Sequence, residues 1–229
     1  MKFAVMQPYL FPYLGYYQLV HAVDKFVFYD DVNYIKGGYI NRNNICSNEK
    51  PQRYTVPVPG MSSNILINKL SFDSNVKKQL KSIEQAYSKA PFFKDVFPIV
   101  ESVLTEERRN VEHICRLSIT RVMDYLDINK SYYYSSELCY ERDVPAAKRL
   151  VNISKSFDLN EYINSPGGKS LYNKDYFLEH GIKLNFIEIG EYQYNQNSNV
   201  FLPHLSMIDV LMWNSKDEVV DLLNKYRLS

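Results

Sequence analysis

The sequence has few cysteines, almost no net charge and no long apolar run, and each of these absences argues against a class of protein. Three cysteines, an odd number without close spacing, argue against a disulfide framework and against a zinc site. A net charge of +1 over 229 residues gives no electrostatic case for binding nucleic acid or a charged membrane surface. No apolar run approaches the roughly 20 residues of a membrane span, and the N-terminus lacks the apolar core of a signal peptide. We therefore expect a cytoplasmic protein without a bound metal.

Standard catalytic motifs are missing as well. The chain has no GxSxG, HExxH or CxxC pattern, and no GxGxxG follows its first apolar run. Its four histidines are scattered, and only His204, which precedes an apolar helix pattern, is a candidate for early testing. Tyrosine is the residue type in excess, with 20 residues beside a single tryptophan. Tyr is common where sugars are held, although an AT-rich coding bias explains the excess more simply.

The first 45 residues contain the most informative pattern. Apolar runs at 2–6 and 26–29 flank a segment with helical spacing, which predicts a strand, a turn, a helix and a second strand. The second run ends in Asp30 and Asp31. In open α/β sheets the ligand crevice lies outside the carboxyl ends of the strands. We therefore expect the turn at Gln7, Pro8 and Tyr9 to lie near this pair of carboxylates.

The rest of the chain predicts the fold class. Residues from about 74 to 128 show three helical stripes, and strand patterns return at 132–138, 161–164 and 183–189. This alternation predicts a single α/β domain over 1–229, with a three-layer, mostly parallel, Rossmann-like sheet and a helical insertion or flank. Near the end, Ser206 and Asp209 fit a capping box, which makes Asp209 a capping partner or a buried carboxylate near a site.

Two glycine-containing turns are candidate anion sites. In the first, Lys36 and Arg42 flank a Gly pair, which suits phosphate or carboxylate, but a polar hairpin explains the same pattern. The second follows the strand at 161–164 and contains Gly167 and Gly168, with Lys169 as a countercharge. It lacks the spacing of a Walker A loop, and either an anion-binding nest or an ordinary turn fits it.

Residues 13–16 permit a fold-level analogy. Nucleotide-binding α/β enzymes with a His-x-Gly-His signature place that tetrapeptide at the start of the first helix, where it stabilises phosphates. Tyr13-Leu14-Gly15-Tyr16 stands in the same place, with Tyr in place of both His. Because Tyr carries no positive charge, nucleotidyl transfer by that mechanism is in doubt.

The chain resembles the WbqC-like family over nearly its whole length. The matching motifs are Met6-Gln7-Pro8-Tyr9, Phe11-Pro12-Tyr13, Gly15-Tyr16, Tyr29-Asp30-Asp31-Val32, Tyr34-Ile35-Lys36, Ile40-Asn41-Arg42-Asn43, Lys89-Ala90-Pro91, Tyr162-Ile163-Asn164, Gly167-Gly168, Leu171-Tyr172 and Leu205-Ser206 to Asp209. Members of this family are encoded with genes for O-antigen and other surface polysaccharides. One proposal for the family is transfer of glycine onto an amino sugar. His204 is not part of the motif.

Together, residues and resemblance predict a transferase of surface-polysaccharide biosynthesis, which moves an aminoacyl (glycyl) or acyl group to the amine of a nucleotide-linked amino sugar. The alternatives are a His-x-Gly-His-like adenylating enzyme and a non-catalytic sugar-nucleotide binding protein. No cofactor is predicted with certainty, and the one candidate is a nucleotide, either as part of the sugar-nucleotide substrate or as ATP. The donor is unidentified, and a homodimer is left open. The predicted catalytic residues are Asp30, Asp31 and Gln7. The predicted substrate-binding residues are Pro8, Tyr9, Tyr13, Tyr16, Tyr34, Lys36, Asn41, Arg42, Asn43, Asn164, Ser165, Gly167, Gly168, Lys169, Tyr172, His204 and Asp209.

Overall fold

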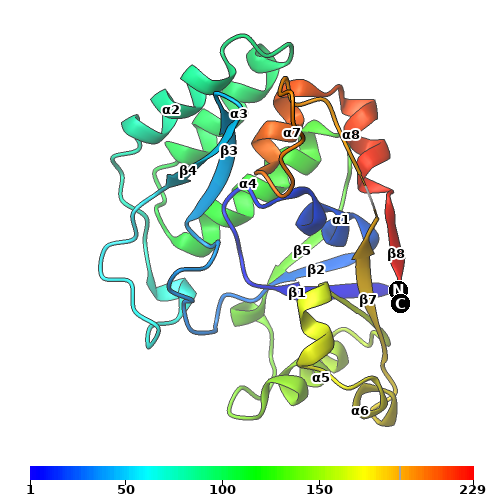
Figure 1. Cartoon of the computed structure of the whole chain (residues 1–229). Coiled ribbons are helices and arrows are strands. Elements are labelled where there is room, and N and C mark those ends of the chain that lie inside the picture. Colours follow the sequence, from blue (N-terminus) through cyan, green and yellow to red (C-terminus); the bar gives the residue numbers. More distant parts are fainter. Residues whose placement is uncertain (191) are drawn as a thin grey trace.

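A computed structural model describes residues 1–190 and 192–229. A six-stranded sheet in the order β5-β2-β1-β6-β7-β8 forms its centre (Figure 1). The strands are β1 (Lys2–Met6), β2 (Lys25–Phe28), β5 (Ser131–Tyr134), β6 (Glu161–Asn164), β7 (Lys183–Ile189) and β8 (Tyr226–Leu228). All neighbouring strands pair in parallel except β7 and β8. The predicted mostly parallel α/β sheet is therefore confirmed.

Helices cover both faces of the sheet, which gives the predicted three layers. One face carries α1 (Leu14–Ala22), α2 (Lys77–Tyr87), α3 (Phe93–Leu104), α4 (Val111–Tyr125), α7 (Met207–Trp213) and α8 (Lys216–Leu223), and the other carries α5 (Ala146–Ser156) and α6 (Lys174–Glu179). Strand residues alternate between the two cores: Ala4 packs with the larger helical layer, whereas Phe3 and Val5 pack with α5 and α6. None of the described helices has the length and apolarity that a membrane crossing requires.

The segment between β2 and β5 contains a small hairpin and the predicted helical stretch. Strands β3 (Arg42–Ser47) and β4 (Lys50–Thr55) pair in antiparallel fashion apart from the main sheet. The short 3-10 helix η1 (Ile67–Lys69) follows, and then α2, α3 and α4. Their apolar residues, such as Ile83, Val96 and Ile114, join the same core as α1. The hairpin turns at Asn48 and Glu49, both with positive φ. The Gly pair at 37–38 therefore lies in the loop before β3 and is not the hairpin turn that the simpler interpretation predicted.

One local prediction was wrong, and of the two roles left open for Asp209 the structure shows the buried carboxylate. The strand expected over 132–138 ends at Tyr134, and the 3-10 helix η2 (Ser135–Glu137) follows because Ser135 turns to bond the carboxylates after β2. Ser206 does cap α7, but Asp209 does not complete a capping box. Its carboxylate instead accepts hydrogen bonds from Tyr87 and Tyr194. The capping box that forms is in α8, between Ser215 and Glu218.

Candidate functional site

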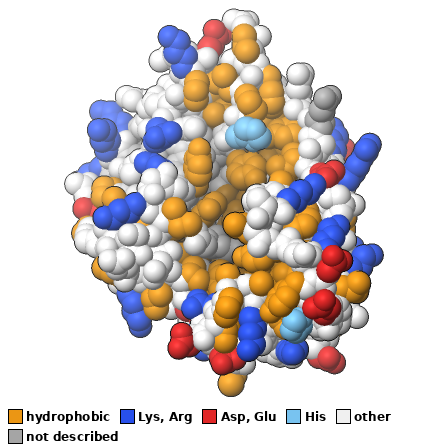
Figure 2. Space-filling model, turned by 60° about the horizontal axis from the view of Figure 1, so that its bottom comes forward, with side chains coloured by type: hydrophobic (Ala, Val, Ile, Leu, Met, Phe, Trp, Pro, Cys, Tyr) orange, Lys and Arg blue, Asp and Glu red, His pale blue; other side chains and the backbone are white. Residues whose placement is uncertain are grey.

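Two adjoining pockets lie at the carboxyl ends of β1 and β6. The chain runs from β1 outward to β2 and β5, then returns to β6 on the other side of β1, so the strand order reverses between β1 and β6. Open α/β sheets bind their ligands in the crevice at such a reversal. Figure 2 shows this side of the molecule as a hollow with apolar side chains on its floor and most charged side chains outside it.

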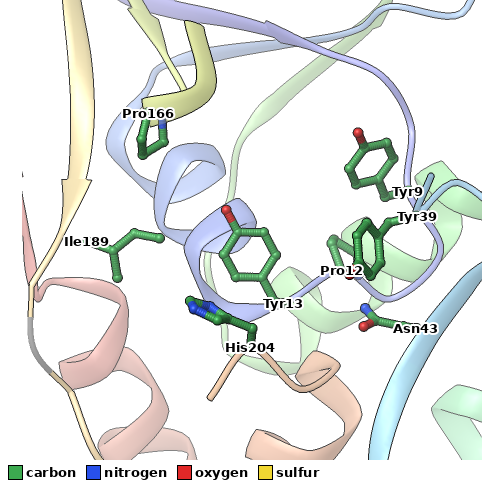
Figure 3. A pocket seen from close by; sticks show the side chains of 8 residues that line it. All are labelled: Tyr9, Pro12, Tyr13, Tyr39, Asn43, Pro166, Ile189 and His204. Atoms are coloured by element: carbon green, nitrogen blue, oxygen red, sulfur yellow. The ribbon is translucent and has the colours of Figure 1, made fainter. Parts of the chain in front are cut away.

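The first pocket, called here the switch-point pocket, has a volume of about 340 Å³. Its lining residues are Val5, Met6, Gln7, Tyr9, Tyr29, Leu150, Tyr162, Asn164, Ser165, Gly167, Gly168, Leu171 and Tyr172. The second, called here the His204 pocket, has a volume of about 390 Å³. It is lined by Tyr9, Pro12, Tyr13, Tyr39, Asn43, Pro166, Ile189 and His204 (Figure 3). Tyr9 lines both, so the two pockets adjoin, and each has the size of a small-ligand site.

Tyr13 and His204 form the centre of the His204 pocket. Their rings meet edge to face, with centroids 5.7 Å apart. Tyr13 occupies the N-cap position of α1, and Gly15, in the first turn of this helix, lies close to the Ile189 side chain. A Cβ at Gly15 would stand 2.2 Å from Ile189 Cδ1 and 2.5 Å from the Tyr13 ring. A side chain at Gly15 would therefore displace Ile189 or Tyr13, both of which line the His204 pocket.

The C-terminal segment joins the His204 pocket to the N-terminal loop. The Ser206 hydroxyl donates to the carbonyl oxygen of Phe11 at 2.7 Å, and the Met207 N–H donates to that of Pro12 at 2.8 Å. The loop that carries His204, whose φ is +59°, is thus anchored beside Tyr13. Asn43 completes this wall, because its Nδ2 also donates to Phe11 O, at 2.8 Å.

The switch-point pocket presents side-chain amides. The Oε1 atom of Gln7 is buried and has no hydrogen-bond partner in the described part of the chain, whereas the backbone carbonyl of Gln7 accepts a 2.8 Å bond from the Tyr16 hydroxyl. Asn164 Oδ1 accepts from the N–H of Ser165 at 2.7 Å. A Cβ at Gly168 would lie 2.5 Å from Asn164 Nδ2, so this glycine lets the turn approach the amide closely.

Tyrosine hydroxyls supply the other polar groups. Burial raises the pKa of Tyr9, Tyr13 and Tyr172, so each stays protonated and able to donate at neutral pH. In Figure 3 the hydroxyls of Tyr9 and Tyr13 point toward the side of the pocket where Pro166 lies. Of the described residues that line either pocket, none is Asp, Glu, Lys or Arg. The site therefore suits a polar, aromatic or sugar-containing ligand held by stacking and neutral hydrogen bonds.

Asp30 and Asp31, the predicted catalytic pair, line neither pocket. Asp30 is 1% exposed and accepts from the Ser135 hydroxyl at 2.9 Å and the Ser136 hydroxyl at 2.6 Å. Asp31 accepts from Tyr140 at 2.8 Å and forms a 2.6 Å ion pair with Arg142. These contacts tie the end of β2 to η2, so the pair is bound by the chain itself, and its catalytic role stays a prediction.

The three predicted cations also lie outside the pocket walls. Lys36 is exposed. Arg42 donates to the carbonyl oxygens of Gly37 and Gly38 and so fixes the turn that it was expected to share with a ligand. Lys169 pairs with Glu188 at 2.5 Å. The predicted phosphate-binding cations are therefore not brought together at either pocket.

Several other predicted site residues have internal contacts instead. Pro8, Tyr16 and Tyr34 are buried, and Asn41 Nδ2 donates to Val56 O at 2.9 Å. Asp209 is fully buried, and burial raises its pKa to about 6. Predicted residues that do line the pockets are Gln7, Tyr9, Tyr13, Asn43, Asn164, Ser165, Gly167, Gly168, Tyr172 and His204. The described residues hold no group of three or more His, Cys, Asp or Glu that would suit a metal ion.

Lining residues that the sequence did not single out are mostly aromatic or apolar. Tyr29 directly follows β2 and precedes the Asp pair, and Tyr39 lies in the Gly-containing turn. Both lie inside or next to motifs of the WbqC-like family, and this position in the sequence could have marked them as site residues. Ile189 and Leu150 carried no signal, because a pocket-lining aliphatic residue looks the same in sequence as a core residue.

The profile of the WbqC-like protein family matches residues 7–221. The chain belongs to this family. It is also similar to an uncharacterized protein of Mycobacterium tuberculosis (strain ATCC 25618 / H37Rv), Rv1507c, with 28% identity over 231 residues and 99% of each chain covered. No solved structure matches the chain significantly. The WbqC-like match includes both the Gln7 turn and the Gly167 turn, so it spans both walls of the switch-point pocket.

Proposed function

We propose that the protein is a transferase of surface-polysaccharide biosynthesis that moves an aminoacyl or acyl group onto the amine of a nucleotide-linked amino sugar. The observation that carries this proposal is the pair of pockets joined at Tyr9. A sugar nucleotide has two parts of different chemistry, and a transferase must also admit a donor. Two adjoining pockets suit that requirement, and membership of the WbqC-like family supports the pathway.

The switch-point pocket suits the nucleotide end of the substrate. It lies where open α/β sheets bind nucleotides, and it combines the aromatic rings of Tyr29, Tyr162 and Tyr172 with the amide of Gln7. Gln7 lines this pocket, and its buried Oε1 has no partner among the described residues, so a ligand N–H or O–H that reached this oxygen would satisfy an open acceptor. The amino sugar then extends past Tyr9 into the His204 pocket, where Tyr13 and Tyr39 provide ring faces for the sugar.

His204 is suited to the proton transfer that amide formation requires. The amine nitrogen attacks the acyl carbon of the donor, the new C–N bond forms, and the bond from that carbon to the leaving group breaks. The proton released by the amine passes to the His204 imidazole and from there to the leaving group. A neutral imidazole can accept this proton, whereas the carboxylates of Asp30 and Asp31 are already engaged with other side chains.

The decisive experiment is product detection by mass spectrometry after incubation with amino-sugar nucleotides and activated acyl or aminoacyl donors. With a substrate pair in hand, His204→Gln is expected to lower kcat by roughly 100-fold or more while leaving substrate affinity within a few-fold. The matched control is His180→Gln, because His180 is exposed and lines neither pocket. Equal turnover by both variants and the wild type would remove His204 from the mechanism.

A His-x-Gly-His-like adenylating enzyme gains little from this geometry. Tyr16, which replaces the second His, uses its hydroxyl on the Gln7 carbonyl, and Ile189 covers Gly15. Release of pyrophosphate from ATP in the presence of an amino acid would favour this alternative. Binding of sugar nucleotides without any product from a broad donor set would favour a non-catalytic binding protein.

A further inference from the structure

The proposed sugar-nucleotide substrate carries phosphate groups, yet the pocket walls carry no charge among the described residues. The inference below rests on the proposed function and names the group that receives those phosphates. The sequence suggested three cations for this role. Lys36 is exposed, Arg42 donates to backbone carbonyls, and Lys169 is paired with Glu188. A different cation has to be sought at the edge of the switch-point pocket.

Arg149 of α5 is the candidate for that role. The next residue, Leu150, lines the switch-point pocket, as does Tyr29 from the end of β2. Arg149 contacts the hydroxyl of Tyr29: burial raises the pKa of this phenol, and the guanidinium opposes the rise. The Arg149 Nε atom donates to the carbonyl oxygen of Val144 at 3.3 Å, which orients the side chain. Among the described residues, no carboxylate forms an ion pair with Arg149.

Gly167 provides space on the other side of the same pocket. Tyr29 follows β2 and Gly167 follows β6, so they flank the Gln7 turn that follows β1 between them. A Cβ at Gly167 would meet only the Ser165 hydroxyl, at 4.0 Å, and Gly167 does not have a positive φ. Neither packing within the described residues nor backbone conformation therefore requires glycine at this position. A ligand that lies close against the turn would require it.

We propose that Arg149 binds the phosphate groups of a nucleoside diphosphate-linked substrate at the edge of the switch-point pocket, with Gly167 leaving the space that they occupy. A guanidinium suits this role because it forms two parallel hydrogen bonds to phosphate and is always charged. The Tyr29 hydroxyl, already in contact with Arg149, can donate a further bond. Phosphate recognition is thus supplied by α5, not by the glycine turns that the sequence suggested.

The test compares Arg149→Gln with the wild type and with Lys148→Gln. Lys148 is the preceding residue of α5, its side chain is 50% exposed, and its amine lies 3.9 Å from Glu141. Its replacement therefore removes the same charge from the same helix without touching the pocket. The probes are inorganic pyrophosphate, a nucleoside diphosphate-linked sugar and the matching nucleoside, each measured by calorimetry. Circular dichroism and thermal unfolding without ligand establish that each variant is folded.

Arg149→Gln is expected to weaken binding of pyrophosphate and of the nucleotide sugar by at least about tenfold, because a charge-assisted bond is lost. Nucleoside binding and the behaviour of Lys148→Gln should match the wild type within about twofold. Gly167→Ala should weaken binding of the nucleotide sugar and leave the thermal unfolding temperature unchanged. Arg149→Lys should recover part of the affinity, because it restores the charge without the fork geometry.

Two results would overturn the assignment: equal nucleotide-sugar affinity in Arg149→Gln and wild type, or no detectable binding of pyrophosphate to the wild type. The first leaves the proposed function standing, because the substrate still binds. Conversely, pyrophosphate binding that depends on Arg149, together with no binding or turnover of any amino-sugar nucleotide, keeps the phosphate site and removes the proposed function.

Discussion

The sealed cluster around Asp30 and Asp31 and the open site around Tyr9 lie close to the same end of the sheet, yet they are built in opposite ways. In the sealed cluster, every carboxylate oxygen accepts a hydrogen bond from another side chain or the backbone. In the open site, Gln7 Oε1 has no partner, and the walls are aromatic. Saturated polar groups stabilise a fold, whereas an unsaturated one in a pocket is available to a ligand. The sequence had predicted both regions as parts of one site, with Asp30, Asp31 and Gln7 as its catalytic residues.

The largest expected effect is on stability, from Asp31→Ala. This change leaves Arg142 without its ion pair and Tyr140 without its acceptor. Because Asp31 is buried while the Arg142 side chain is 41% exposed, we expect a loss of about 2–3 kcal/mol in the free energy of unfolding. Urea denaturation measures it. A loss below about 0.5 kcal/mol would show that the cluster is not a structural tie and would return Asp31 to the catalytic candidates.

A second prediction concerns Asp209, which is sealed in the same way but titrates. Burial raises its pKa from 3.8 to about 6, so between these pH values the folded state holds a proton that the unfolded state has lost. The contribution of Asp209 to stability is therefore fully present below pH 4 and is lost as the pH rises through about 6. We expect the wild type to lose of the order of 3 kcal/mol relative to Asp209→Asn over this interval.

Denaturation of both proteins at pH 4.5, 5.5 and 6.5 tests the Asp209 prediction, and Asp217→Asn, at an exposed residue of α8, is the matched control. A constant stability difference between Asp209→Asn and the wild type across this range would contradict it. If the predicted pH dependence is observed, it shows that a buried carboxylate can be fully hydrogen-bonded and still be costly to ionise, which sharpens the contrast with the open site.

The smallest expected effect on stability is that of Gln7→Met. Because Gln7 Oε1 is buried without a partner, an apolar side chain of similar length removes an unsatisfied acceptor. The free energy of unfolding should stay within about 0.5 kcal/mol of the wild type, or rise slightly, while nucleotide-sugar affinity falls several-fold. A stability loss near 2 kcal/mol would mean that Gln7 belongs to the fold, and the contrast between the two regions would fail.

Much of the fold could be predicted because it depends on periodicity. The alternating apolar pattern placed β1, α1 and β2, and the helical stripes placed α2, α3 and α4. What periodicity cannot supply is the partner of a polar side chain. Asp31 and Arg142 are 111 residues apart, and nothing local to either residue indicates their ion pair. The sequence around Asp209 fits a capping pattern. Its carboxylate is instead bound by the hydroxyl of Tyr87, a residue 122 positions away, and no local pattern indicates that bond.

The candidate site was predictable where its residues carry rare local signals. Gln7, Tyr9 and the Gly167 turn stand at strand ends, and strand ends can be located from sequence. Arg149 gave no signal, because a basic residue on an amphipathic helix is ordinarily a solvated one. Only the packing of α5 against the sheet brings it beside Tyr29.

The bond from Ser206 to Phe11 spans 195 positions of the chain. The wall that carries His204 and the wall that carries Tyr13 therefore meet only after nearly all the intervening structure has formed. A partly synthesised or partly folded chain has no His204 pocket, so occupancy of this pocket reports the completion of folding. A ligand bound there links the first and last segments of the described chain, and we expect it to protect both against proteolysis to the same degree.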